Sequence, residues 1–396
     1  MSTPISSRDL LLPGALALLT IGLRLIFSAR YSDKTLILRV VGLEPAAERP
    51  PYYRPFDSLF APMPFLWCWF DIIILVRVGA LVGHWALWIP IVTLVAGRMR
   101  ALQEIGHNAV HYAMCRSKGW QWFLSNFFFQ FPLMKRDMRS RFITHVKEHH
   151  RNPNDPVRDP NLRRIIEGGV RPGITPRQFH IRLFYPFSPR GFWVNLRTST
   201  INSLRGNSSW YVVVTRVVAL TLALSLLWLT GGTEGVVIGY AVPLLLIYPF
   251  FSWISILAEH RWFCPNDQAS DRWQMECVNC RPTEFPGASG WIVRHLIFPL
   301  SDKYHLAHSL YPHVHWCYLP AIDRHLRQHD PYYSAYQSEG LLFPRGPLPA
   351  ALSELKRRLS TPRPGDLAAW GEQFAVSKVA RDRQDFGGEG LPPAGS

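Results

Sequence analysis

The chain has 396 residues, of which 48% are hydrophobic, and it contains 15 Trp and 23 Phe. Such a composition is typical of a protein with several membrane helices and a smaller polar part. The formal net charge of +15 would suit a nucleic-acid partner, but the basic residues are concentrated in one segment between apolar stretches. That arrangement excludes an autonomous nucleic-acid-binding domain.

Six apolar stretches divide the chain. The first has no clear cleavage site after it, so we expect a retained membrane helix instead of a signal peptide. Arg77 separates the second stretch from the third, and Asp71, inside the second, is interpreted as a contact to a neighbouring helix or as a functional acid. The fourth is shorter than the about 20 residues that cross a bilayer, so we expect it to be re-entrant or interfacial. The stretches are residues 9–29, 58–76, 79–97, 119–134, 210–230 and 235–257, the last two forming a tight hairpin.

The charges predict how the chain lies in the membrane. Residues 135–205 carry 15 basic and five acidic side chains, whereas the loop at 231–234 carries one acid and no base. Because basic loops face the cytoplasm, we expect residues 135–205 on that side. If residues 119–134 do not cross, every histidine group described below also faces the cytoplasm. The predicted fold is an all-α membrane helical bundle with a cytoplasmic helical cap. The Arg-rich and Pro-rich composition suggests a bacterial source, so we expect the membrane to be a bacterial inner membrane.

The sequence is expected to divide into three parts. Residues 1–57 contain the N-terminal membrane helix and a linker, and residues 58–335 form the membrane domain with the histidine groups. Residues 336–396 contain a surface helix, predicted at 350–359, and a mobile tail from residue 360.

Six cysteines are present, and a cytoplasmic setting keeps thiols reduced, so we expect no structural disulfide. Cys277 and Cys280 have the spacing of a zinc knuckle, but no second pair of this kind follows. Together with Cys264 they could form a three-thiolate site, although loop cysteines are the simpler interpretation.

Eight histidines gather in four short groups, each just outside an apolar stretch. Two groups contain a pair spaced i, i+4, which places both rings on one face of a helix, where they can grip one ion. Imidazole is the ligand that iron, copper and zinc prefer at neutral pH. Four groups at one membrane edge therefore predict a polynuclear metal site. The groups are His107 and His111; His145, His149 and His150; His260; and His305 and His308.

The ligand type indicates the metal. A nitrogen-rich, thiolate-poor site with many ligands favours iron over zinc or an iron–sulfur cluster. A tetrahedral site uses four ligands, so eight imply two ions or more. Two irons beside a lipid interface suggest oxygen activation, because iron and O₂ can remove hydrogen from an unactivated C–H bond. No amino-acid side chain does this unaided.

At this point the sequence resembles the membrane fatty-acid desaturase superfamily, over residues 58–335. The first two histidine groups resemble the first two histidine boxes of that superfamily, and His305-Leu-Ala-His308, followed by Ser309-Leu-Tyr-Pro, resembles the third. His260 falls where many members carry an extra ligand. The resemblance implies that the eight histidines bind two iron ions and that O₂ is the co-substrate.

The resemblance also implies a fatty-acyl desaturase that introduces a C=C bond into an acyl chain. The substrate would be a lipid, an acyl-CoA or an acyl carrier protein, and its chain would enter a narrow tunnel between the helices. Electrons would come from a separate carrier, such as a ferredoxin or a cytochrome b5-type protein with its reductase. Acyl hydroxylases, acetylenases and carotenoid ketolases share the fold and remain alternatives, as does a non-catalytic membrane metal-binding protein.

One departure from the resemblance concerns the third box, where Ser309 occupies the place of the last histidine. Serine is a poor iron ligand, so one iron would have an open position unless His313 or His315 fills it. Three polar residues after the second box are candidate partners for the ligand histidines, or else form turns beside the neighbouring prolines. They are Asn152, Asp155 and Asp159.

Overall fold

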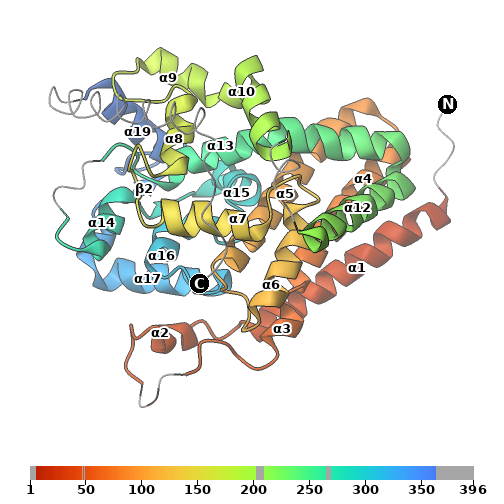
Figure 1. Ribbon diagram of the computed structural model, residues 1–396, viewed down its shortest axis with the longest axis horizontal. Helices are drawn as coiled ribbons and strands as arrows, with labels where there is room; N and C mark the ends of the chain where they lie inside the picture. The colour runs from red at the N-terminus through yellow and green to blue at the C-terminus, as the bar shows by residue number, and fades with distance from the viewer. Residues whose placement is uncertain (1–5, 47, 49, 202–208, 265–268, 363–396) are drawn as a thin grey trace.

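The computed structural model describes residues 6–46, 48, 50–201, 209–264 and 269–362. These residues are largely helical, and their one sheet pairs two short parallel strands, β1 (Thr283–Glu284) and β2 (Ser338–Glu339). The long helices gather at one end of the molecule and the short ones at the other (Figure 1). The predicted all-α helical bundle is confirmed.

The long helices form the membrane part. Four apolar segments are long enough to cross a bilayer, namely Asp9–Arg30, Asp57–Val82, Trp85–Val110 and Trp210–Glu259. The last reverses direction at Gly232, whose φ of 57° and ψ of −149° interrupt the helix. Two legs therefore meet there as a hairpin, as the sequence predicted. The helices of this part are α1 (Ser7–Arg30), α4 (Met63–Val82), α5 (Trp88–Val110), α12 (Trp210–Val236) and α13 (Tyr248–Glu259), with π-helical turns η6 (Val237–Ala241) and η7 (Pro243–Ile247) between the last two.

The boundary predicted at Arg77 is wrong. Helix α4 continues past Arg77 and ends at Gly83, which adopts the left-handed conformation that glycine accepts most easily. Arg77 does not interrupt the helix, because its guanidinium has two partners on neighbouring helices. It donates to the carboxylate of Asp9 at 3.0 Å and to the carbonyl oxygen of Thr230 at 3.3 Å. Neighbouring helices thus satisfy its charge inside the bundle.

Asp71, in contrast, contacts neighbouring helices, the first of the two interpretations given for it. Its carboxylate pairs with Arg24 of α1 at 2.5 Å and with Arg98 of α5 at 3.4 Å, and so ties three helices together. The fourth apolar stretch forms helix α6 (Lys118–Ser125) and the π-helical segment η2 (Asn126–Gln130). This is too short to cross a bilayer, as expected.

Short helices form the cap that carries most of the histidines. Many begin with a side-chain cap: Asp137, Asp159, Thr175, Ser188 and Asp271 each accept hydrogen bonds from amides of the following first turn. The cap contains α7 (Met138–Phe142), η3 (Ile143–His149), α8 (Pro160–Glu167), α9 (Pro176–Leu183), η4 (Tyr185–Phe187), α10 (Pro189–Asn195), η5 (Leu196–Ile201), α14 (Arg272–Asn279), α15 (Gly287–Leu296), η8 (Asp302–Tyr304), α16 (His305–Leu310), η9 (Trp316–Tyr318), α17 (Leu319–His329) and α18 (Pro331–Ser334). The elements α2 (Leu36–Val40), α3 (Asp57–Phe60) and η1 (Trp85–Leu87) connect the long helices.

The C-terminal helix is not the surface helix that was predicted. Helix α19 (Ala351–Ser360) buries Leu352, Leu355 and Leu359 in the main hydrophobic core. Its Glu354 carboxylate binds the buried guanidinium of Arg281 at 2.8 Å. Apolar residues at i, i+3 and i+7 give this short helix a face that the core covers. The division into three parts stays a prediction, and the predicted tail lies outside the described residues from residue 363 on.

Candidate metal centre

The eight predicted histidines meet in two clusters beside the end of α5. Within each cluster the available ligand atoms lie within 4.8 Å of one another. Helix α5 and its C-cap, the η3 segment, the C-cap of α13 and helix α16 supply them. The five-histidine cluster is His107, His111, His145, His150 and His308, and the three-histidine cluster is His149, His260 and His305.

The second histidine group is divided between these clusters, which contradicts the prediction that His145 and His149 grip one ion together. Residues Ile143–His149 form a π-helical segment, and the amide of His150 donates to the carbonyl oxygen of His145 at 3.0 Å. This i→i+5 bond widens the turn. Rings five residues apart therefore meet, with 3.1 Å between the Nε2 atoms of His145 and His150. His149 belongs to the other cluster.

Ring nitrogens face one another inside each cluster. In the five-histidine cluster, 2.6 Å separates the Nε2 atoms of His107 and His145. In the three-histidine cluster, Nε2 of His260 lies 3.1 Å from that of His149 and 2.8 Å from that of His305. A neutral imidazole presents a lone pair on one nitrogen, and converging lone pairs repel unless a cation or a proton lies between them. The arrangement fits metal binding.

The surroundings of the rings support the same conclusion. Among the described residues, both ring nitrogens of His111 and of His308 are buried and lack a hydrogen-bond partner. Buried polar atoms without partners are costly, and a metal ion would satisfy one nitrogen of each ring. Burial lowers the pKa of His111 to about 3 and the pKa of His308 well below its usual range. The rings are therefore neutral, as metal coordination requires.

Of the three predicted partners of the ligands, Asp159 contacts a clustered histidine. Its carboxylate lies 2.9 Å from Nδ1 of His149. Burial disfavours the charged ring, but nearby carboxylates led by Asp159 outweigh burial and raise the pKa of His149. This contact keeps the proton on Nδ1 and leaves Nε2 to face the cluster. Asp155 instead accepts from the amides of Val157 and Arg158.

Asn152 does not contact a histidine ring either, because its side chain donates to the carbonyl oxygen of Glu148 at 2.9 Å. The side chains of Asn152 and Asp155 thus bind neighbouring backbone groups. The neighbouring Asn154, which was not predicted, is buried and donates to Asn279 at 2.6 Å, which fixes the chain after the second box against the segment that precedes Cys280.

Three further polar residues near the clusters were missed. Glu104 lies 3.2 Å from Nδ1 of His107, Glu259 lies 3.9 Å from Nδ1 of His305, and Sγ of Cys280 lies 3.1 Å from Nδ1 of His260. The spacing of Glu104 and His107, three residues apart on a helix, was a signal that could have been used. The other two contacts join residues distant in sequence, and their spacing contains no such signal.

Ser309 and the two alternative histidines of the third box lie outside both clusters. Oγ of Ser309 is 3.7 Å from Sγ of Cys280. His313 places Nδ1 at 3.0 Å from the carbonyl oxygen of His111, and the ring of His315 stacks on Tyr31, with 4.7 Å between ring centroids. The structure thus brings neither alternative histidine to the three-histidine cluster. All six cysteines are free and buried, and the two clusters contain histidines only.

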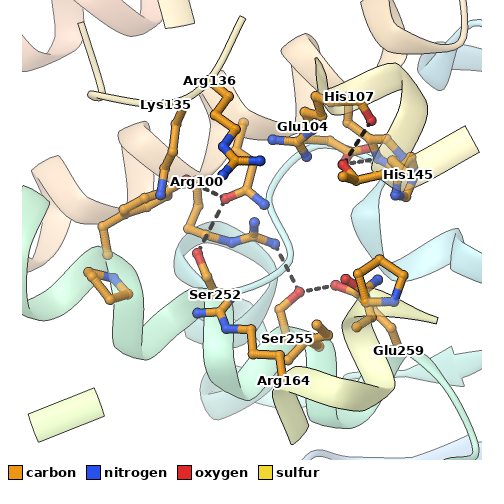
Figure 2. A pocket seen from close by; sticks show the side chains of 18 of the residues that line it. Arg100, Glu104, His107, Lys135, Arg136, His145, Arg164, Ser252, Ser255 and Glu259 are labelled. Atoms are coloured by element: carbon orange, nitrogen blue, oxygen red, sulfur yellow. Dashed lines mark hydrogen bonds and ion pairs between the residues drawn. The ribbon is translucent and has the colours of Figure 1, made fainter. Parts of the chain in front are cut away.

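A cavity of about 370 Å³ adjoins both clusters, with His107, His145 and His305 on its wall. Polar side chains dominate the rest of the lining, which differs from the apolar tunnel that the resemblance implied. In Figure 2, Glu104 and Glu259 lie on the side of the histidines, whereas Lys135 and Arg136 lie at the other side of the view. The charged lining residues are Arg100, Lys135, Arg136, Arg141 and Arg164, and Glu104, Glu259 and Asp302.

Comparison with known proteins assigns this centre to a family. A sequence model of the family described as fatty acid desaturase matches residues 83–340, which include all eight clustered histidines. The chain belongs to the fatty acid desaturase family. It is also similar to the dihydrorhizobitoxine desaturase of Bradyrhizobium elkanii, with 26% identity over 292 residues that cover 69% of this chain and 78% of that protein. The predicted superfamily is confirmed, and membership supports a membrane-associated oxidoreductase of the desaturase type.

Proposed function

We propose that the protein is an O₂-dependent oxidase that holds one iron ion in each histidine cluster and desaturates an acyl substrate. One observation carries the proposal: eight imidazoles, seven of them buried, converge in two groups whose ring nitrogens face one another. Nitrogen-rich sites without thiolate suit iron. Iron bound there would supply, with O₂, the oxidising chemistry that breaks a C–H bond.

The protein's own side chains have separate tasks in this proposal. The imidazoles would hold the ions, and Asp159 and Glu104 orient the rings of His149 and His107 through hydrogen bonds to Nδ1. Glu259 lies further away, 3.9 Å from Nδ1 of His305. Tight burial keeps bulk water away from the clusters, apart from the cavity through which a substrate would reach them. A three-imidazole set also leaves coordination positions open, as catalytic metal sites do.

Substrate, electron donor and location are parts of the same proposal. The family implies an acyl substrate, whereas the similar Bradyrhizobium elkanii enzyme is named for dihydrorhizobitoxine, so the chemical identity of the substrate is a separate question. Two electrons per turnover would come from a separate carrier with its reductase. The basic segment at 135–205 supports a cytoplasmic orientation of the clusters in a bacterial inner membrane.

Metal content and product mass test the proposal. We expect purified protein to contain about two irons per chain, because eight imidazoles exceed the four ligands of one tetrahedral ion. A host that expresses the protein should accumulate a compound two hydrogens lighter than its precursor. His149→Ala should abolish this product while the protein stays in the membrane, and His329→Ala, a change at an exposed cap histidine, should not.

Other results would revise or reject the proposal. A product that gains one oxygen would identify a hydroxylase on the same fold. Zinc in place of iron, or no O₂-dependent product in any fraction, would contradict the oxidase. Full activity in His149→Ala would contradict the assignment of that ring as a ligand.

A further inference from the structure

The stretch between Glu167 and Trp210 differs from its surroundings in charge. It contains six arginines and no aspartate, glutamate or lysine, and Phe, Trp, Ile and Leu residues lie between the arginines. The structure describes most of this stretch, as α9, η4, α10 and η5. Short helices that combine basic and large apolar residues without acids are typical of segments that lie in the surface of a membrane.

Three large apolar side chains of this stretch are exposed. Ile181 of α9 and the C-cap residue Phe184 are each 59% exposed, and Phe187 of η4 is 42% exposed. Since Ile181 and Phe184 are three residues apart at the end of a helix, they lie on one face. A patch of exposed large apolar side chains marks a contact with a membrane or with another protein.

The two exposed phenylalanines lie against the membrane part. The ring centroid of Phe250 in α13 is 5.7 Å from that of Phe184 and 5.0 Å from that of Phe187. Phe250 belongs to the apolar segment Trp210–Glu259. It follows the reversal at Gly232 by 18 residues, which span about 27 Å in a helix, close to the roughly 30 Å of a hydrocarbon core. The exposed rings are therefore placed where the hydrocarbon core ends, on the side of the cap.

Helix α10 lies beside the same membrane leg. Its Phe192, and Leu196 just after the helix, line a small recess together with Leu244 and Leu245 of η7. Trp193, which follows Phe192, is 56% exposed. In Figure 1, α9 and α10 lie next to α13, where the short helices meet the long ones. The α9–α10 surface (residues 176–197) thus adjoins the face that the membrane covers.

The α9–α10 surface also carries positive charge that the protein does not neutralise. Its four arginines are exposed, and within the described residues no carboxylate oxygen lies within 4.0 Å of their nitrogens. Two of them lie near one ring, since burial raises the pKa of Tyr185 and the charges of Arg190 and Arg182 oppose that shift. Guanidinium groups bind phosphate oxygens with paired N–H donors. The four arginines are Arg177, Arg182, Arg190 and Arg197.

We propose that the α9–α10 surface is a membrane-binding site outside the spanning helices, which inserts its exposed apolar side chains among the lipids beside α13 and binds the phosphates of anionic phospholipids through its four arginines. An acidic protein would also match the arginines, but the contacts of Phe184 and Phe187 with Phe250 favour the membrane. The inference is independent of the reaction, because no residue of this surface belongs to a histidine cluster.

Fluorescence quenching in vesicles tests the insertion. Phe184→Cys in the full-length protein is labelled with bimane and reconstituted into equal parts of phosphatidylcholine and phosphatidylglycerol, with a nitroxide on the acyl chain close to the headgroup. All six native cysteines are free and buried, so wild type treated in the same way gives the background. The label at position 184 should lose about half of its fluorescence or more, as expected for a side chain in the headgroup region.

Tyr332→Cys is the matched control for the insertion. Tyr332 is an aromatic residue of α18 with the same 59% exposure, and α18 packs on α14, at the end of the molecule away from the long helices (Figure 1). Its label should keep its fluorescence. An unquenched label at position 184 would overturn the proposal and leave the surface to a water-soluble partner. Equal quenching at both positions would overturn it too, because the quenching would then not be specific to this surface.

Lipid selectivity tests the role of the arginines. Delipidated full-length protein in detergent is mixed with equal amounts of phosphatidylglycerol and phosphatidylcholine, and bound lipids are counted by native mass spectrometry. Wild type should retain phosphatidylglycerol in preference. Arg182→Gln combined with Arg190→Gln should reduce that preference by at least about tenfold, because each arginine near an anionic membrane surface contributes roughly fivefold. Circular dichroism checks that the helical content is unchanged.

A second pair of arginines controls for total charge. Arg272→Gln combined with Arg324→Gln removes the same charge from exposed positions of α14 and α17 and should keep the preference for phosphatidylglycerol. Loss of preference in this control as well would show a general charge effect and would overturn the proposal. Equal retention of both lipids by wild type would overturn it too, because the arginines would then not recognise the anionic headgroup.

Discussion

The two histidine clusters differ in how they hold their rings. The five-histidine cluster has more imidazoles, but two of its rings, His111 and His308, lack any polar partner among the described residues. The three-histidine cluster has fewer rings, yet each of its Nδ1 atoms faces a polar group from Asp159, Glu259 or Cys280. The five-histidine cluster thus offers more rings, and the three-histidine cluster offers fewer rings whose second nitrogens each face a polar group.

This difference indicates where each cluster is vulnerable. Partners of the second ring nitrogen fix the tautomer and raise the basicity of a ligand, so they matter most where ligands are few. The three-histidine cluster is also the one beside Ser309, where the resemblance expected another histidine. We therefore expect changes near this cluster to have larger effects than matched changes near the other.

The largest effect should come from removing a ring. His260→Ala leaves two imidazoles in its cluster, too few to retain an ion, so iron should fall by about one per chain and turnover should become undetectable. His308→Ala leaves four imidazoles in the other cluster, and iron should stay close to the wild-type value. Elemental analysis of both purified variants, with turnover measured beside it, makes the comparison. Equal iron loss in both would contradict the difference.

A smaller effect is expected from changing a residue that contacts a clustered histidine but does not belong to the cluster. Asp159→Asn keeps the shape of the side chain but removes the negative charge beside Nδ1 of His149. Iron affinity or turnover should fall by roughly 10–100-fold. Asp155→Asn is the matched control, because Asp155 binds only backbone amides. A comparable loss in Asp155→Asn would mean that the loop, and not the ring contact, is what matters.

The least direct support of the three-histidine cluster comes from α19. Arg281 donates to the carbonyl oxygen of His260 at 3.1 Å and is itself paired with Glu354. Glu354→Gln would leave a buried guanidinium without its charge partner, so stability should fall by about 3–5 kcal/mol. Thermal unfolding followed by tryptophan fluorescence measures it, with Glu234→Gln at an exposed position near the end of α12 as the control.

Acid should reduce the difference between wild type and Glu354→Gln. Burial alone would raise the pKa of Glu354, but Arg281 and Arg358 overcome it and lower the pKa to about 2. Because an unfolded glutamate titrates near about 4.3, the contribution of the pair is complete above that pH and is lost as the pH falls towards about 2. A constant difference in stability between the two proteins across this range would argue against the ion pair.

The sequence was sufficient for the parts of this molecule that depend on local pattern. Apolar length predicted the membrane helices and the hairpin at Gly232, and the grouped histidines predicted that distant segments meet. It was insufficient where tertiary contacts decide. The charge of Arg77 predicted a helix boundary, but Asp9 of another helix pairs with it and the helix continues. The sequence of α19 predicted a surface helix, but the core covers its apolar face.

The same limit applies to the site. Spacing predicted that eight histidines serve metal ions, but not how they divide, because a π-helical turn cannot be distinguished from an α-helical one by counting residues. The contacts of Cys280 and Glu259 with histidines, and the polar cavity, arise between segments far apart in the chain. No local pattern contains that information.

The π-helical segment at Ile143–His149 has a consequence for protein engineering. Grafting its sequence onto a regular α-helix of another scaffold would preserve every histidine and still misassign them. His145 and His149 would share one face and His150 would turn away. The graft would therefore offer one pair of rings, instead of two rings to one cluster and one ring to the other. The transplantable unit is therefore the backbone geometry together with the residues, and a designer who copies the motif alone would obtain a different arrangement of the rings.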